Sequence, residues 1–145
     1  MAGCDDLPPV VWKSDFFGTT EAFALLDGVV DVYLADFKFG DDTCARRIAG
    51  VENYLRVVTR NLVSAADQGD LIVRHLLLPG HFDCCFRPIL SWLRANLPGV
   101  KFSIRDGYLP SWNAEKHAEL AHPLAPGEGA RARGLATRVG LRVVE

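Results

Sequence analysis

The chain has 145 residues, of which 49% are hydrophobic, a length and composition that fit one folded domain. Its net charge of −2, from 16 basic and 18 acidic residues, provides no basic field of the kind that binding to nucleic acid or an anionic membrane requires. We therefore expect neither of these partners.

No apolar run reaches the length of about 18 residues that spans a bilayer. Arg74 and His75 interrupt the best candidate, at 71–78. The first six residues lack the basic and apolar regions of a secretory signal, so we expect a cytoplasmic protein. We also expect residues 1–9 to be an unstructured lead and residues 10–145 to form a single α/β domain.

The cysteines are too few and too irregularly spaced to predict a disulfide scaffold. They are Cys4, Cys44, Cys84 and Cys85. Neighbouring residues do not readily ligate one metal together, so Cys84 and Cys85 are expected to be free thiols.

Apolar periodicity predicts strands that alternate with helices along the chain. Strands are predicted at 10–13, 29–37, 71–78, 100–105 and 141–144. Helices are predicted from Thr20 to a stop at Gly28, from Asp41 or Asp42 to Gly50, and at 53–68, 86–96, 113–121 and 130–139. The near-continuous apolar run at 71–78 is typical of a parallel strand covered on both faces. This order favours a parallel sheet with right-handed crossovers, either a complete open sheet or an arc of a barrel.

Two charges end the strand at 29–37. Asp36 and Lys38 are two residues apart and are therefore expected on one face, at the carboxyl edge where barrel enzymes keep their chemistry. A surface salt bridge is the alternative. Arg74 lies within the apolar run of the next strand, where its guanidinium needs partners. It is expected either to line a cavity that holds a carboxylate or phosphate, or to pair with Asp36.

Two loops carry further candidates. His81, Asp83, Cys84 and Cys85 lie within five residues, so metal ligation is one interpretation, and a helix-capping Asp83 with a solvated His81 is the other. Asp106 and Tyr108 follow the strand at 100–105. They are expected either to contact a ligand or to be ordinary polar residues of a surface loop.

Three motifs in this order resemble radical S-adenosylmethionine proteins of the pyruvate formate-lyase activating enzyme-like group. They are VVWKSD at 10–15, DVYLADFKFGDD at 31–42 and VRHLLLPG at 73–80. The resemblance implies an incomplete parallel (β/α) barrel, here of about five strands, and S-adenosylmethionine as cofactor. It implies that Asp36 and Lys38 lie near the methionine end of the cofactor and that Arg74 helps to hold its carboxylate.

The motif C-x3-C-x2-C, which ligates the 4Fe-4S cluster in this family, is absent, and so is the glycine-glycine-glutamate motif that follows it. Reductive cleavage of S-adenosylmethionine needs an electron from that cluster. We therefore expect the carboxyl-terminal portion of such an enzyme, from a truncated or split gene, which is inactive alone. One alternative is a non-enzymatic half-barrel completed by a separately encoded subunit that carries the cluster. The other is a metal-dependent hydrolase that uses His81, Asp83 and His75.

Overall fold

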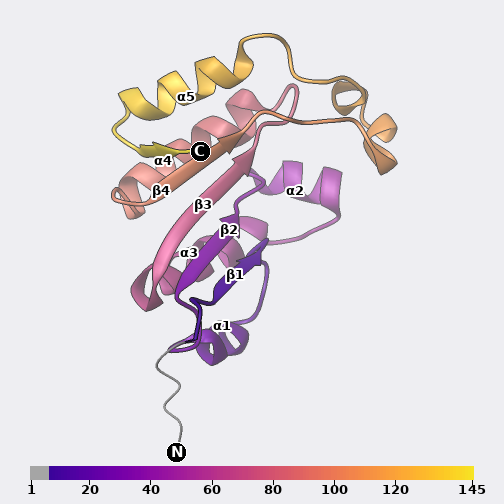
Figure 1. Ribbon diagram of the computed structural model, residues 1–145. Coiled ribbons are helices and arrows are strands. Elements are labelled where there is room, and N and C mark those ends of the chain that lie inside the picture. The colour runs from indigo at the N-terminus through magenta and orange to yellow at the C-terminus, as the bar shows by residue number, and fades with distance from the viewer. Residues whose placement is uncertain (1–6) are drawn as a thin grey trace, which may run out of the picture.

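The computed structural model describes residues 7–145 (Figure 1). The predicted lead at 1–9 lies mostly outside the described residues, as does Cys4, and residues 7–9 precede the first strand without regular structure. From residue 11 onward the elements form one continuous α/β arrangement.

Five parallel strands form one sheet in the order β1-β2-β3-β4-β5. They are β1 (Val11–Ser14), β2 (Val32–Asp36), β3 (Asp70–Leu76), β4 (Lys101–Arg105) and β5 (Arg142–Val144). Every strand pairs in parallel with the next strand along the chain, and a helix lies in each connection between them. The predicted α/β fold, a partial barrel of five strands, is confirmed.

The α-helices lie between these strands, within a few residues of the predicted bounds. They are α1 (Thr20–Leu26), α2 (Asp42–Ala49), α3 (Tyr54–Gln68), α4 (Arg87–Asn96) and α5 (Glu128–Arg138). Local chemistry explains the ends of α2: the Asp41 side chain caps its first turn, and Gly50 ends it in the left-handed conformation at φ 68°.

Two segments differ from the expected helices. The predicted helix at 113–121 is instead a pair of 3-10 helices, η2 (Trp112–Lys116) and η3 (Ala118–Ala121). Leu120 is the one buried residue in this segment, which therefore has no apolar stripe to support a longer α-helix. The predicted helix at 86–96 is preceded by a π-helical turn, η1 (Phe82–Phe86).

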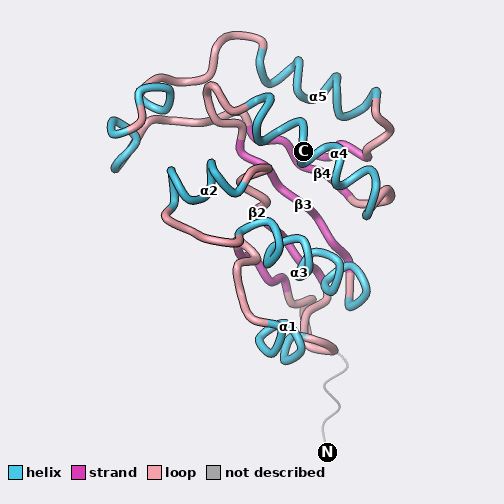
Figure 2. The backbone as a smooth tube through the Cα atoms, turned by 180° about the vertical axis from the view of Figure 1, so that it is seen from behind, coloured by secondary structure: helices cyan, strands magenta, loops and turns pink. Residues whose placement is uncertain are grey.

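Helices cover one face of the sheet. Figure 2 shows α3 and α4 in front of the strands, and Figure 1 shows the same strands from the opposite side with these helices behind them. Tyr33, Val73 and Phe102 are fully buried beneath the helices. The other face of β3 carries Ile72, Arg74 and Leu76, which are half-buried or exposed, so the prediction of a strand covered on both faces is wrong for the described residues.

Buried polar contacts tie α3 to the loop after β1. The Asn61 side chain is buried, and its Nδ2 donates to the carbonyl oxygens of Phe16 at 2.8 Å and Gly18 at 3.0 Å. The bond to Phe16 satisfies a buried backbone acceptor, and Gly18 also accepts from Arg60 Nη2 at 2.9 Å. Among the described residues, no helix has both the length and the apolar character that crossing a membrane demands.

Candidate functional site

Asp36 and Arg74 form an ion pair across neighbouring strands. They are register partners at the carboxyl ends of β2 and β3. Arg74 Nε donates to Asp36 Oδ1 at 2.6 Å and Nη2 donates to Oδ2 at 3.1 Å, which is a bidentate contact. Lys13 Nζ, from β1, lies 3.7 Å from the same carboxylate. Pairing of Arg74 with Asp36, one of the two predicted outcomes, is therefore present, and it directs both side chains toward the open face of the sheet.

Lys38 lies in the loop immediately after β2. Its backbone N–H donates to the hydroxyl of Tyr54 at 2.8 Å, which fixes the loop against α3. Burial raises the pKa of Tyr54, so the hydroxyl stays protonated. The Lys38 side chain is exposed and has no ion-pair partner among residues 7–145. It is a cation available to a ligand.

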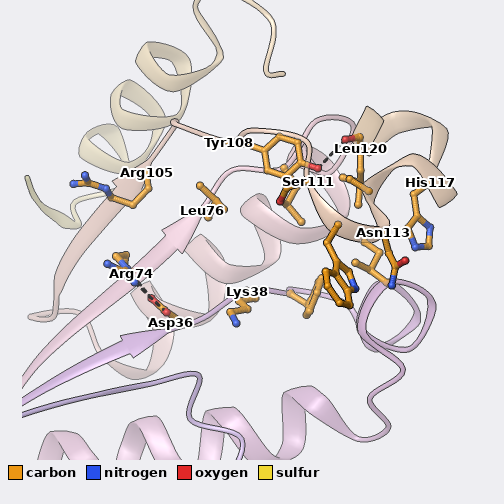
Figure 3. Close-up of a pocket in the computed structure, with 15 residues that line it drawn as sticks. Asp36, Lys38, Arg74, Leu76, Arg105, Tyr108, Ser111, Asn113, His117 and Leu120 are labelled. Atoms are coloured by element: carbon orange, nitrogen blue, oxygen red, sulfur yellow. Dashed lines mark hydrogen bonds and ion pairs between the residues drawn. The ribbon is translucent and has the colours of Figure 1, made fainter. Parts of the chain in front are cut away.

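Asp36, Lys38 and Arg74 line one pocket of about 410 Å³ at the carboxyl edge of the sheet (Figure 3). The pocket lies within the size range of small-molecule sites. Arg105, from the end of β4, adds a third cationic group, and the 3-10 segment forms the opposite rim. The apolar and aromatic lining comes from Phe39, Ile48, Leu76, Leu78, Tyr108, Trp112 and Leu120.

Two aromatic side chains shape the rim. Tyr108 Oη donates to the carbonyl oxygen of Leu120 at 2.7 Å, which joins the loop after β4 to η3 (Figure 3). Trp112 is 91% exposed and has a left-handed backbone at φ 53°, a conformation that non-glycine residues adopt mostly at constrained or functional positions. Tyr108 thus lies at the pocket as expected. Asp106 does not: it pairs with Arg133 at 2.7 Å, which holds the pKa of its carboxyl below the ordinary value.

A second cluster lies behind the pocket rim. Cys44 on α2 meets His81, Cys84 and Cys85 around η1, and their ligand atoms all lie within 4.8 Å of one another. Cys84 Sγ is 3.6 Å from Cys44 Sγ, 4.0 Å from Cys85 Sγ and 3.2 Å from His81 Nδ1. His81 is 4% exposed, so the expectation of a solvated histidine is wrong.

The outer side of His81 is held by charged residues. Its Nε2 lies 3.3 Å from Glu119 Oε1 and 3.3 Å from Arg47 Nη2, and Arg47 also pairs with Glu119. Arg47 Nη1 lies 3.2 Å from Nδ1 of His117, which lines the pocket. A hydrogen bond from its own backbone N–H and the contact with Arg47 lower the pKa of Glu119 to about 2. The cluster and the pocket rim therefore share one ion-pair network.

Burial raises the pKa of the Cys44 and Cys85 thiols, so both are protonated at neutral pH in the absence of a cation. The backbone N–H of Gly40 near the Cys85 sulfur partly offsets this rise in the pKa of Cys85. Sequence reasoning grouped His81 with Cys84 and Cys85, but Cys44 was missed because nothing in its local spacing connects it to a loop 40 residues away.

The residues of the predicted hydrolase do not come together. His75 is fully buried, with Nδ1 at 2.8 Å from the carbonyl oxygen of Phe37, and burial lowers its pKa to about 4. Asp83 is exposed and pairs with Arg87 at 2.7 Å. Neither joins the described group of ligand atoms that contains His81.

The described cysteines also do not fit a 4Fe-4S cluster. In such a cluster each iron takes its own thiolate, so the ligands surround a body of several atoms. Here the three thiols and His81 crowd around a single point.

A comparison with family models finds no match to this chain. The chain is similar to "Uncharacterized protein MJ0674" of Methanocaldococcus jannaschii, with 37% identity over 136 residues. The matched region is 94% of this chain but 40% of that protein, so the chain spans less than half the length of this relative.

Proposed function

We propose that this chain forms the S-adenosylmethionine-binding half of a radical S-adenosylmethionine enzyme of the activating enzyme-like group. One observation carries the proposal: Asp36, Lys38 and Arg74, named by the sequence resemblance, line a single pocket at the carboxyl ends of β2 and β3. Parallel-strand enzymes place their ligands at this edge. The pocket also combines the two surfaces that an adenosylated amino acid needs, cationic groups and aromatic rings.

The chain's own residues divide the ligand into two ends. The ammonium of Lys38 lies free to meet the carboxylate of the methionine end. The Asp36–Arg74 pair offers one carboxylate for its amino group, while two of the three guanidinium nitrogens of Arg74 are already engaged. Trp112 and Tyr108 supply flat apolar surface on which an adenine ring stacks. When bound beside an iron–sulfur cluster, S-adenosylmethionine supplies radical chemistry in the family that the chain resembles.

Equilibrium binding of S-adenosylmethionine to the full chain, followed by calorimetry, tests the proposal. We expect saturable binding that Lys38→Ala weakens about 10-fold, the loss of one charge-assisted hydrogen bond. Trp112→Ala should weaken the binding of adenosine and S-adenosylmethionine alike. Lys116→Ala removes an exposed lysine outside the pocket and is the matched control. Absence of saturable binding, or equal binding by wild type and Lys38→Ala, would contradict the proposal.

The open face of the sheet favours a second element of this function. Parallel sheets are normally covered on both faces. Here β1 pairs only with β2 among the described strands, and Val11 and Trp12 are 57% and 41% exposed. We propose that cluster-bearing strands of the same barrel, from a complementing subunit or a further segment, pair with β1 and close this face. Light scattering tests this element, together with thermal unfolding of the same chain. A monomer that unfolds cooperatively would argue against any need for a partner.

A further inference from the structure

We propose that Cys44, His81, Cys84 and Cys85 bind one zinc-class divalent cation in a Cys3His site, separate from the ligand pocket. This proposal does not depend on which ligand the pocket binds. It rests on the geometry of the four ligand atoms, on the contacts behind them and on the local backbone.

The spacing of the four atoms fits a tetrahedron around one ion. With Zn–S of about 2.3 Å and Zn–N of about 2.0 Å, tetrahedral ligation places sulfurs about 3.8 Å apart and sulfur about 3.5 Å from nitrogen. Cys84 Sγ lies 3.6 Å and 4.0 Å from the other two sulfurs. His81 Nδ1 lies 3.2 Å and 3.7 Å from the sulfurs of Cys84 and Cys85. Four of the six separations thus lie near the values that a single cation requires, and the other two, from Cys44 to Cys85 and to His81, are within 4.8 Å.

The contacts behind these atoms are those of a histidine ligand. Metal-bound histidines donate their other ring N–H to a carboxylate or carbonyl, which fixes the tautomer. If Nδ1 of His81 faces the cation, its Nε2–H points to Glu119 Oε1 at 3.3 Å. Arg47 beside this carboxylate adds positive charge near a centre with three thiolates.

The π-helical turn explains how adjacent cysteines contribute to one site. Side chains of neighbouring residues on an α-helix point apart, and from the sequence Cys84 and Cys85 were not expected to ligate one metal together readily. In η1 the carbonyl oxygen of His81 accepts from the N–H groups of both Cys85 and Phe86, at 3.0 and 3.2 Å. This wider turn leaves the sulfurs of Cys84 and Cys85 only 4.0 Å apart. Such turns are rare and occur often at functional sites.

A disulfide between Cys44 and Cys84 is the competing use of these groups. It would consume two of the four donors and leave His81 and Cys85 without a role. A cation uses all four. The bound cation would also join α2 to η1 and, through Glu119 and Arg47, to the rim residue His117. It would therefore fasten the pocket rim to the sheet.

The full chain, reduced, stripped with chelator and kept anaerobic, is titrated with Co²⁺ and then with Zn²⁺. We expect one equivalent of Co²⁺ to give thiolate-to-metal charge transfer with the visible bands of tetrahedral coordination, and Zn²⁺ to displace it. X-ray absorption of the zinc form should show three sulfur ligands and one nitrogen ligand. This measurement uses the unaltered chain and does not depend on whether a variant folds.

Variants assign the ligands. Cys84→Ser and Cys44→Ser should each abolish the tetrahedral spectrum and weaken Zn²⁺ binding by more than about 100-fold, while Glu119→Gln weakens it about 10- to 100-fold. Two controls should bind as wild type does: Cys4→Ser, which removes a cysteine outside the proposed set, and His122→Gln, which removes an exposed histidine.

Two results would overturn the proposal. One is that the reduced full chain binds less than one equivalent of metal, or that X-ray absorption finds fewer than three sulfur ligands. The other is a Cys44–Cys84 disulfide that forms in air in a chain that, once reduced, takes up no metal. The S-adenosylmethionine titration distinguishes this failure from failure of the proposed function, because Lys38 variants leave the four metal ligands unchanged.

Discussion

Substituting Gly40 by alanine should destabilise the protein more than its small size suggests. Gly40 lies in the loop after β2, where its Cα packs against the backbone of Cys85 in η1. A Cβ placed on Gly40 would lie 2.2 Å from the Cys85 carbonyl oxygen and 2.9 Å from the Cys85 carbonyl carbon and Cα. The obstacle is backbone, so no side-chain rotation relieves it.

The size of the effect follows from this contact. The Cβ–oxygen separation must lengthen from 2.2 Å to at least 3.0 Å, which requires β2 and η1 to move apart. Forced expansion of a packed region costs about 1–3 kcal/mol, occasionally more. For a chain of this size each kcal/mol lowers Tm by about 2–4 °C, so Gly40→Ala should lower Tm by roughly 2–12 °C. The shift should also misplace Cys85 and weaken Zn²⁺ binding.

Thermal unfolding followed by circular dichroism measures this effect, with metal removed so that folding and binding are separate. Gly99→Ala is the matched control, because a Cβ at Gly99 meets no atom within 4 Å and its backbone is not left-handed. We expect the control to unfold within about 1–2 °C of wild type, as surface substitutions do. Equal Tm values for Gly40→Ala, Gly99→Ala and wild type would refute the close approach of β2 and η1.

Three further predictions concern stability. Asn61→Ala removes the donor to the buried carbonyl oxygen of Phe16 and should cost about 1–3 kcal/mol in urea unfolding. Unfolding free energy should fall as pH drops from 6.5 toward 4, by up to about 3 kcal/mol, because the unfolded chain protonates His75 while the folded chain keeps it neutral. His75→Asn should flatten that dependence. In a double-mutant cycle, Asp36→Ala and Arg74→Ala should show a coupling free energy of about 1 kcal/mol, since the pair is bidentate but partly exposed.

Each of these has a defined contrary result. Asn96→Ala removes an exposed intrahelical bond and should cost less than about 0.5 kcal/mol, so an equal loss for Asn61→Ala would contradict the role of its buried bond. An unchanged pH slope in His75→Asn would assign the acid effect to other groups. Additive single-variant effects at Asp36 and Arg74 would mean that the ion pair contributes nothing measurable.

The sequence by itself determined the order of elements and most of their bounds. Apolar β-branched runs and helical periodicity depend on local preference, so β2, α2 and α3 lie close to their predicted ranges. It also placed Asp36 and Lys38 at a carboxyl edge, because strand direction follows from the alternation of strands and helices. The helix predicted at 113–121 was wrong because the conformation of this segment depends on what it packs against, which local periodicity does not report.

The tertiary structure alone decided which distant groups meet. The sequence left Arg74 either to a ligand or to Asp36, and strand register settled their direct contact. No local pattern connects Cys44 with His81, Cys84 and Cys85, because α2 and η1 approach only when the sheet folds and the backbone of Gly40 admits close packing. Long-range proximity comes from packing across the sheet, and a one-dimensional pattern does not encode it.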